Sequence, residues 1–481
     1  MTATSPATTL GGQLAAFAAA HGPAGVPLPA PVVRSVAQRV LDVLGIAVAA
    51  TTLPTSVAVL DLVAERGGRP DARVVGLRQR VPASEAAFAH GVLAHSLDYD
   101  DTHLPSVLHP SASVVPAALA VAEPTRATGA EVVAAIAVGL EICVRVGMAG
   151  YDAATGANRY FDRGQHATSM CGAVGSAAAA AKLLGLSADG VLHAMGIAAS
   201  MASGIIESNR TGGTVKRMHC GWAAHAGVYA AQLAQRGITG PATLLEGRFG
   251  FFQAFLGGEF DAGAVIDGLG QRWEVPGIFF KPYPANHFTH AGIDAALALR
   301  DAGLRPADVA SVELAVPTAT VRTIGEPLDV KQAPETGYQA QFSGPYTVAA
   351  ALLGGGGGLG LGLDDFTDDL ARDPVRRRLM SRVTVVADPR CDEIFPHQFP
   401  AVLRVRTTDG RLLEEAVLAN RGGSHRPLTD EEVAGKFRDN AGRVLPPERV
   451  TAIARAARAL PDAASVDDLL SPLMFENGIP L

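Results

Sequence analysis

The sequence predicts a mainly helical protein with an inserted α+β domain. Three observations support this fold class. Residues 1 to about 270 are rich in Ala and Leu, and β-branched alternation is scarce there. After Trp273, segments with strand-like alternation appear, and after about residue 422 the helical texture returns. A discontinuous all-helical domain, interrupted by a smaller α+β lid domain, explains all three changes.

The first part of the chain contains several segments of helical length delimited by Gly, Pro or Ser. They are 32–50, 112–122, 130–147, 167–184 and 223–236, and the apolar run 86–95 is also helix-like. Segment 167–184 is unusually rich in Ala, Gly and Ser. Small residues let helices approach closely, so we expect this helix at the centre of a bundle.

The inserted domain mixes strands and helices. Alternation predicts strands over 309–321 and 382–386, and a hairpin over 401–420 whose two-residue turn is Asp409-Gly410. Helices are expected at 290–302, 346–353 and 373–380.

The last part of the chain is helical again. Thr429 and Glu432 have the spacing of a capping box, and helices are expected at 433–441, 447–460 and 465–470. The expected layout is a helical domain of residues 1–275 and 422–481, with the α+β lid at 276–421.

Composition limits the kinds of partner. The chain has 481 residues, too many for one ordinary core. Its 40 basic and 47 acidic residues give a net charge of −7, which argues against a nucleic-acid or anionic-membrane surface. The Ala-rich run 132–147 carries Glu141 and Arg145 and is shorter than the roughly 20 apolar residues of a membrane span. We therefore expect a buried helix there.

The cysteines and the N-terminus favour a cytoplasmic protein without a metal. Cys143, Cys171, Cys220 and Cys391 form no CxxC pair and match no zinc or iron–sulfur spacing. An HExxH motif is also missing, so we expect no metal site. The first Arg is Arg34, so the N-terminus does not resemble a signal peptide. Free thiols are typical of a reducing cytosol.

Polar groups are concentrated directly after the apolar run 86–95. Residues 98–103 read Asp-Tyr-Asp-Asp-Thr-His, and His109-Pro110 follows. These groups either satisfy one another structurally or face a ligand. The structural alternative has Asp100 and Asp101 capping a helix and a turn, and it places His90 and His95 in a core or an interface.

Four other segments combine reactive side chains with helix starts or stiff loops. Residues 163–169 place His166 at the start of the small-residue helix, and 209–220 contain Arg210, Lys216, Arg217 and His219 before an Ala-rich helix. Residues 279–290 hold Lys281 between aromatic residues and prolines, and 341–346 end in Tyr346. Backbone N–H groups at a helix start, with cations nearby, favour a carboxylate or a phosphate.

These residue types suit chemistry next to a carboxylate. Removing a proton α to a carboxylate, or losing carbon dioxide from it, builds charge that fixed cations stabilise. Lys216 and Lys281 suit the clamp, with Arg210 or Arg217 as additional cations. His109 and His166 suit proton transfer, because an imidazole titrates near neutral pH. Asp98 could orient a histidine or act as a base, and His219 is a further candidate for substrate binding.

The chain resembles the MmgE/PrpD family, which includes 2-methylcitrate dehydratase, cis-aconitate decarboxylase and iminodisuccinate epimerase. The segments that carry the resemblance run in order through most of the chain. They are HSLDYDDTH (95–103), RGQHATSMCGAVGSAAAAAKLLGL (163–186), GGTVKRMHCGWAAHAG (212–227), GPATLLEGRFGFFQAF (240–255), KPYPANHFTHAGIDA (281–295), QFSGPYTVAAALL (341–353) and PLTDEEVAGKF (427–437). Gln341 stands where many relatives have Lys, and Asn286-His287 replaces small or Cys residues.

The resemblance implies a homodimer with a cofactor-free site between the helical domain and the lid. By motif position, the site residues would be Asp98, Thr102, His109, His166, Lys216, Lys281 and Tyr346. Three functions remain open. The first is a lyase, a dehydratase or decarboxylase of a small di- or tricarboxylate. The second is an epimerase that abstracts a proton and returns it on the opposite face. The third is a non-catalytic dimer that binds carboxylates.

Overall fold

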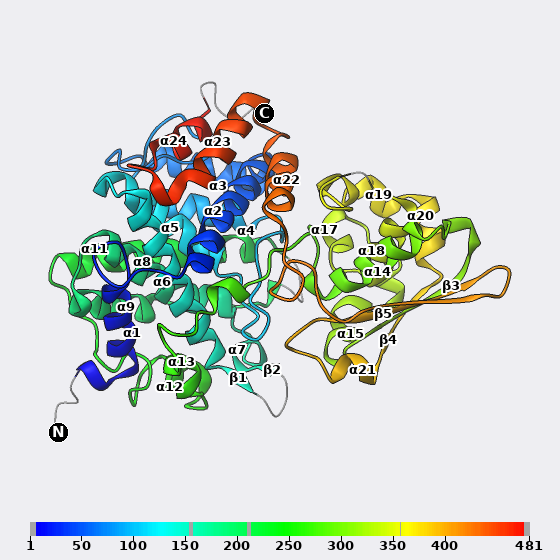
Figure 1. The fold of residues 1–481 in the computed structure, drawn as a ribbon, viewed down its shortest axis with the longest axis horizontal. Coiled ribbons are helices and arrows are strands. Elements are labelled where there is room, and N and C mark those ends of the chain that lie inside the picture. Colours follow the sequence, from blue (N-terminus) through cyan, green and yellow to red (C-terminus); the bar gives the residue numbers. More distant parts are fainter. Residues whose placement is uncertain (1–5, 153–156, 209–212, 356, 476–481) are drawn as a thin grey trace. The chain divides into compact units, whose positions relative to one another are not determined.

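A computed structural model describes residues 6–152, 157–208, 213–355 and 357–475 (Figure 1). Its contacts divide the chain into two compact units. The first unit is Met1–Ile278 with Ala441–Leu481, and the second is Phe279–Asn440. The first is almost wholly helical and the second combines helices with a four-stranded sheet, so the predicted fold class is confirmed.

The first unit is a bundle of helices. The N-terminal helices are α1 (Leu10–Ala20), α2 (Ala30–Ala50), α3 (Pro54–Arg66), α4 (Ala83–His95), α5 (Ser111–Thr125), α6 (Gly129–Met148), α8 (Ala167–Leu183), α9 (Ala188–Met201) and α11 (His219–Gln235). Shorter elements are β1 (Tyr151–Asp152), β2 (Ala157–Asn158), α7 (Arg159–Asp162), α12 (Phe251–Leu256) and α13 (Ala262–Ile266). The C-terminal helices α23 (Pro447–Ala459) and α24 (Asp467–Leu470) complete the unit, and α23 packs on α2.

The small-residue helix α8 lies at the centre of this bundle, as expected. It contacts α5, α6, α9 and α11 (Figure 1). Its glycines allow backbones to meet, because a Cβ at Gly175 would lie 2.5 Å from the carbonyl oxygen of Gly139 on α6. The same holds between α4 and α11, where a Cβ at Gly221 would lie 2.4 Å from the carbonyl oxygen of Phe88.

The second unit is built on a mixed sheet with strand order β4-β3-β5-β6. Strand β3 (Val309–Val316) runs parallel to β4 (Val383–Ala387) and antiparallel to β5 (Ala401–Thr407), and β5 pairs antiparallel with β6 (Leu412–Val417). The helices of this unit are α14 (His290–Asp301), α15 (Thr318–Gly325), α16 (Leu328–Lys331), α17 (Gly337–Ala340), α18 (Gly344–Leu353), α19 (Asp368–Arg372), α20 (Pro374–Met380), α21 (Pro389–Asp392) and α22 (Asp430–Ala441). The apolar faces of α14 and α18 share one core with the sheet.

Two local predictions in this unit were wrong. The strand expected over 309–321 ends at Val316, and Pro317 precedes helix α15. Proline fixes φ and has no N–H for the sheet ladder, which explains the change. In the hairpin, the N–H of Thr407 donates to the carbonyl of Arg411 at 2.9 Å. Three residues therefore lie in the turn instead of two, and Gly410 takes a positive φ of 90°.

The contacts of residues 422–440 differ from the layout expected from the sequence. The sequence predicts these residues in the helical domain, whereas in the structure they group with the second unit. Arg421 pairs with Glu432 of α22, and Phe280 donates its N–H to the carbonyl of Gly422 at 3.0 Å. The capping box of α22 forms as predicted. The Thr429 N–H donates to the Glu432 carboxylate at 2.7 Å, and the Glu432 N–H donates to the Thr429 hydroxyl at 3.2 Å.

Among the helices that the structure describes, no single one is long and apolar enough to cross a membrane. Helices α2 and α3 pass the length and composition test only as a pair, and they are bent by 97° at the break between them.

Candidate active site

The segment 96–110 is a loop that leads from α4 into α5. Asp98 and Val107 both have a positive φ, 51° and 54°. His103 and Leu108 pair across the loop, with the N–H of His103 donating to the carbonyl of Leu108 at 2.8 Å. The loop therefore folds back on itself and brings His109 to the start of α5.

Asp101 ties this loop to the helical core. Its carboxylate accepts from Arg39 of α2 at 2.7 Å and from the N–H and hydroxyl of Ser111. Arg39 and Asp101 are both almost fully buried. Burial raises the pKa of Asp101, and the positive charge of Arg39 opposes that shift. Such a buried pair fixes the loop, because separating it would leave a charge without compensation.

His109 has a defined tautomer. Its Nδ1 lies 2.7 Å from the carbonyl oxygen of Asp101, which can only accept, so Nδ1 carries the proton. Nε2 of the neutral ring is then a proton acceptor. The hydroxyl of Thr102 is a weaker neighbour of Nδ1, at 3.4 Å, and the His109 N–H donates to Thr168 of α8 at 3.2 Å.

His166 and His219 meet at the starts of two helices. His166 is the N-cap of α8, His219 begins α11, and their Nδ1 atoms are 3.0 Å apart. Burial, assisted by neighbouring imidazoles and Lys216, holds the pKa of His166 well below its usual value. The same causes lower the pKa of His219 to about 4. Both rings are therefore neutral at pH 7, and one donates its proton to the other.

His95 belongs to the same cluster, which the sequence analysis did not expect. Its ring lies 5.4 Å from that of His109 and 5.5 Å from that of His166, between centroids. Its Nδ1 is 2.7 Å from the buried carboxylate of Asp100. The spacing of Asp100 five residues after His95 was visible in the sequence, but the position of His95 within an apolar helix favoured a core role.

Lys216 brings a cation to this cluster. It lies on the short 3₁₀ helix Val215–Met218 directly before α11, and its Nζ is 3.2 Å from Asp98 Oδ1. Arg217 turns to Thr55 at the start of α3, where its Nη1 donates to the hydroxyl at 2.9 Å. Arg210, the other cation considered for the clamp, lies outside the described residues.

Lys281 lies in the second unit and is 1% exposed. Its loop is held at both ends. Phe280 pairs with Gly422 through the backbone, and the N–H of Asn286 donates to the carbonyl of Gln341 at 2.8 Å. Two segments that carry the family resemblance therefore meet within this unit.

Tyr346 lies deeper in the second unit than a substrate-binding role suggests. Its ring belongs to the hydrophobic core. Its hydroxyl donates to the carbonyl of Asp365 and accepts from Arg376 at 3.2 Å. Burial raises the pKa of Tyr346 to about 12. To reach a ligand, the hydroxyl would have to exchange these bonds, so its role in binding stays a prediction.

Within the described ranges, one group of side chains has the spacing of a metal site. His95, Asp100 and Cys220 offer ligand atoms within 4.8 Å of one another. The contact between His95 and Asp100 accounts for two of them without an ion. Burial raises the pKa of the Cys220 thiol well above its usual value, which disfavours the thiolate that a metal would need. The metal-free site stays a prediction.

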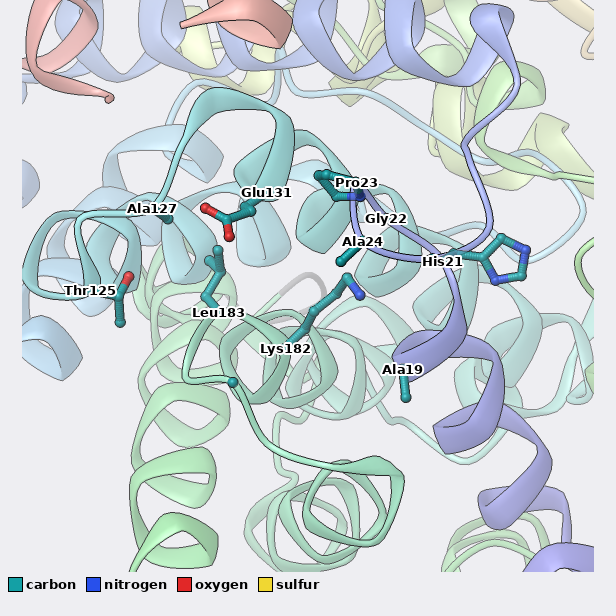
Figure 2. A pocket seen from close by; sticks show the side chains of 12 residues that line it. Ala19, His21, Gly22, Pro23, Ala24, Thr125, Ala127, Glu131, Lys182 and Leu183 are labelled. Carbon is teal, nitrogen blue, oxygen red and sulfur yellow. The ribbon is translucent and has the colours of Figure 1, made fainter. Parts of the chain in front are cut away.

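A separate cavity of about 290 Å³ lies at the other end of α8 (Figure 2). Lys182 and Glu131 line it. Lys182 donates to the carbonyl of Ala18 at 2.9 Å, and the Glu131 carboxylate accepts the Thr128 N–H at 2.8 Å. A helix rises 1.5 Å per residue, so Lys182 lies about 24 Å from His166 along α8. This cavity contains none of the predicted site residues.

Comparison with known proteins agrees with the predicted resemblance. The model of the MmgE/PrpD N-terminal domain matches residues 12–262, and that of the MmgE/PrpD C-terminal domain matches residues 283–462. The chain belongs to the MmgE/PrpD family. Lys281 lies two residues before the second matched range, and every other residue predicted for the site lies within the two matched MmgE/PrpD domains.

Several MmgE/PrpD relatives have assigned activities. Cis-aconitate decarboxylase of Homo sapiens is 30% identical, over 82% of this chain and 79% of its own length. Cis-aconitate decarboxylase of Aspergillus terreus is 28% identical, over 85% of each chain. The 2-methylcitrate dehydratase of Cupriavidus necator is 28% identical over 59% of each.

Proposed function

We propose that this MmgE/PrpD protein is a lyase that removes water or carbon dioxide from a small di- or tricarboxylate without a cofactor. The cluster of His95, His109, His166 and His219 beside the Lys216–Asp98 ion pair carries the proposal. The similar decarboxylases and dehydratases support it, since their names specify tricarboxylic acids.

The proposed mechanism begins with binding of the substrate's carboxylates. Lys216 supplies a positive charge, and the N-termini of α8 and α11 add the partial positive charge of their helix dipoles. In this electrostatic field a carbanion next to a carboxylate becomes less costly to form. Lys281 of the second unit is proposed as a second cation of the same clamp.

His109 is the proposed general base. The bond from its Nδ1–H to the carbonyl of Asp101 presents Nε2 as the acceptor. His166 is the second proposed proton-transfer group, and the neutral state of its ring suits it to accept a proton or donate a hydrogen bond. Thr102, His219, Arg217 and Tyr346 are proposed to position the substrate.

A His109→Ala variant tests the proposal. Loss of a general base lowers turnover by about 10²- to 10⁴-fold, so kcat on a panel of citrate- and aconitate-like acids should fall by that factor. A His90→Gln variant is the matched control, because His90 lies on α4 and its Nε2 only accepts from the Val75 N–H at 2.9 Å. Wild-type turnover in a folded His109→Ala protein would refute the assignment.

Epimerisation is the second candidate, because two imidazoles on different elements, His109 and His166, flank the same ring of His95. An epimerase needs two proton-transfer groups around one carbon. Proton NMR in deuterium oxide distinguishes an epimerase from a lyase. Incorporation of deuterium into the remaining substrate, with inversion of the carbon that carries it, indicates an epimerase. Loss of water or carbon dioxide from the substrate indicates a lyase. Binding without turnover across the panel would favour a carboxylate-binding dimer.

The homodimer and the cytoplasmic location are also part of the proposal. All four cysteines are free and buried, which fits a reducing compartment. Light scattering of the purified protein should give a mass near that of two chains, and a mass near one chain would contradict the dimer.

A further inference from the structure

His95 has no role in the mechanism above, although it lies in the middle of the cluster. Its side chain is 1% exposed, and its Nδ1 is 2.7 Å from Asp100, whose side chain is completely buried. A carboxylate accepts, so Nδ1 carries the proton and Nε2 of the neutral ring presents a lone pair. Nε2 is buried and has no hydrogen-bond partner among the described residues.

An unpaired polar atom in the interior needs an explanation, because nearly all buried polar groups in native proteins are hydrogen-bonded. His90, on the same helix, also has one ring nitrogen without a partner among the described residues, its Nδ1, while its Nε2 accepts the Val75 N–H at 2.9 Å. Nε2 of His95 instead lies among imidazoles that are proposed to handle protons. This position points to a partner that arrives during turnover, and a transferred proton is such a partner.

The charges around the cluster decide where an extra proton is most stable. Two imidazoles face His95: His109 lies before the start of α5, and His166 lies at the start of α8. Lys216, His219 and Cys220 approach from the start of α11. A proton on His166 or His219 would add a second cation beside Lys216 in a buried site. A proton on His95 would form an ion pair with Asp100.

We propose that His95 and Asp100 form a buried dyad that holds the proton taken from the substrate until the second half of the reaction. This rests on the proposed proton-transfer function of His109 and His166. One N–H bond breaks on the imidazole that first received the proton, and one forms at Nε2 of His95. The return step reverses both changes, so no oxidant or further reactant is needed.

Asp100 has the role that an aspartate has beside the histidine of a serine protease. It fixes the tautomer and orientation of the ring and stabilises the imidazolium, without itself taking the proton. His95 acts through His109 or His166 and does not touch the substrate. It is therefore a positioning residue, and its test needs a readout that a purely structural residue would not change.

His95→Asn and Asp100→Asn test the dyad. Asn at position 95 can still donate to Asp100 but has no group in place of Nε2. In the folded full-length protein we expect kcat to fall about 100-fold and KM to stay within about threefold. The double variant should be no slower than the slower single variant, because the two groups act as one unit. His90→Gln is the matched control and should keep wild-type kcat.

The pH profile gives the decisive readout. If His95 must be unprotonated to accept a proton, kcat of the wild-type enzyme falls on acidification. Removing the negative charge of Asp100 makes His95 harder to protonate, so this acidic limb should move to lower pH by about one unit or more in Asp100→Asn. A folded His95→Asn enzyme with wild-type kcat, or an unmoved limb in Asp100→Asn, would overturn the dyad.

An experiment without turnover separates this proposal from the proposed function. If the wild-type protein converts no acid of the panel, the function fails, and the dyad is tested by NMR of the full chain with ¹³C-labelled histidine. The His95 ring, identified by the absence of its signals in His95→Asn, should be the Nδ1–H tautomer, and Asp100→Asn should change its chemical shifts more than His90→Gln does. A His95 ring in the Nε2–H tautomer overturns the dyad. So does activity that chelators abolish and Zn²⁺ restores, because His95, Asp100 and Cys220 would then be metal ligands.

Discussion

Two helix glycines, one in each unit, meet different kinds of neighbour. In the first unit, a Cβ at Gly221 of α11 would lie 2.4 Å from the carbonyl oxygen of Phe88, so backbones lie directly against each other. In the second unit, a Cβ at Gly292 of α14 would lie 2.7 Å from Cδ1 of Leu314, which is the end of a flexible side chain. Backbone contacts leave no room for adjustment, whereas a leucine can change its rotamer.

The charges differ in the same way. The first unit buries complete ion pairs, Arg39–Asp101 and Glu141–Arg145. The second has a more exposed network in which Arg404 joins Asp388 and Glu414. The candidate site lies where the first unit is least adjustable, so the starts of α5, α8 and α11 are held in fixed positions. Small changes in the first unit should therefore have larger effects than similar changes in the second.

The largest effect is expected for Asp101→Ala. It leaves Arg39 buried without its partner carboxylate, which costs about 3–5 kcal/mol. Urea unfolding followed by fluorescence measures this, because Trp222 and Trp273, the two tryptophans of the chain, both lie in the first unit. Glu414→Ala removes an exposed partner in the second unit and should cost less than about 1 kcal/mol by circular dichroism. Equal costs would contradict the contrast between the units.

A smaller effect is expected when one methyl group is added. Gly221→Ala and Gly292→Ala both replace a glycine in a helix, so both gain about 1 kcal/mol of helix propensity. At Gly221 the clash with backbone costs about 3 kcal/mol, for a net loss of about 2 kcal/mol. At Gly292 the leucine can move, and the net change should stay within about 1 kcal/mol. Urea midpoints of the two variants decide whether the first unit is the less tolerant one.

The smallest effect concerns acid sensitivity. Burial lowers the pKa of His90 to about 4, so the folded state binds a proton less readily than the unfolded state, in which the pKa of histidine is about 6.5. Its contribution to stability is present above pH 6.5 and is lost as pH falls toward 4. In the second unit, Arg390 and Arg404 lower the pKa of Asp388 to about 2, so that contribution is lost only in stronger acid.

Between pH 7.5 and pH 5.5, the free energy of unfolding of His90→Gln should therefore fall by about 1 kcal/mol less than that of the wild type. Tryptophan fluorescence in urea at the two pH values measures the difference. Parallel losses in both proteins would show that His90 is not kept neutral by its surroundings.

Much of the fold could be predicted from local patterns. The central position of α8 could be predicted from its many Ala, Gly and Ser residues, because only small side chains allow such close contacts between helices. The pairing of Thr429 with Glu432 and the hairpin around Asp409-Gly410 were also local signals. The end of β3 was missed because alternation continued past Pro317, and the missing N–H of proline counts for more than that pattern.

The candidate site was only partly predictable, because its contacts join distant parts of the chain. Asp101 and Arg39 are 62 positions apart, and His166 and His219 are 53 positions apart, so no local sequence pattern predicts either contact. His95 looked like one more residue of an apolar helix. Its significance came only with the fold, which leaves its Nε2 without a partner between two other imidazoles.

The backbone at Asp98 restricts which residues this position can accept. With a φ of 51°, the left-handed region there admits Gly, Asn and Asp readily and strains β-branched or bulky residues. Among all substitutions at position 98, these three residues should give the most stable folded proteins. The ion pair with Lys216 would then distinguish Asp from its neutral isostere Asn. The backbone conformation at position 98 therefore favours Gly, Asn and Asp, and among these three only Asp can form the ion pair with Lys216.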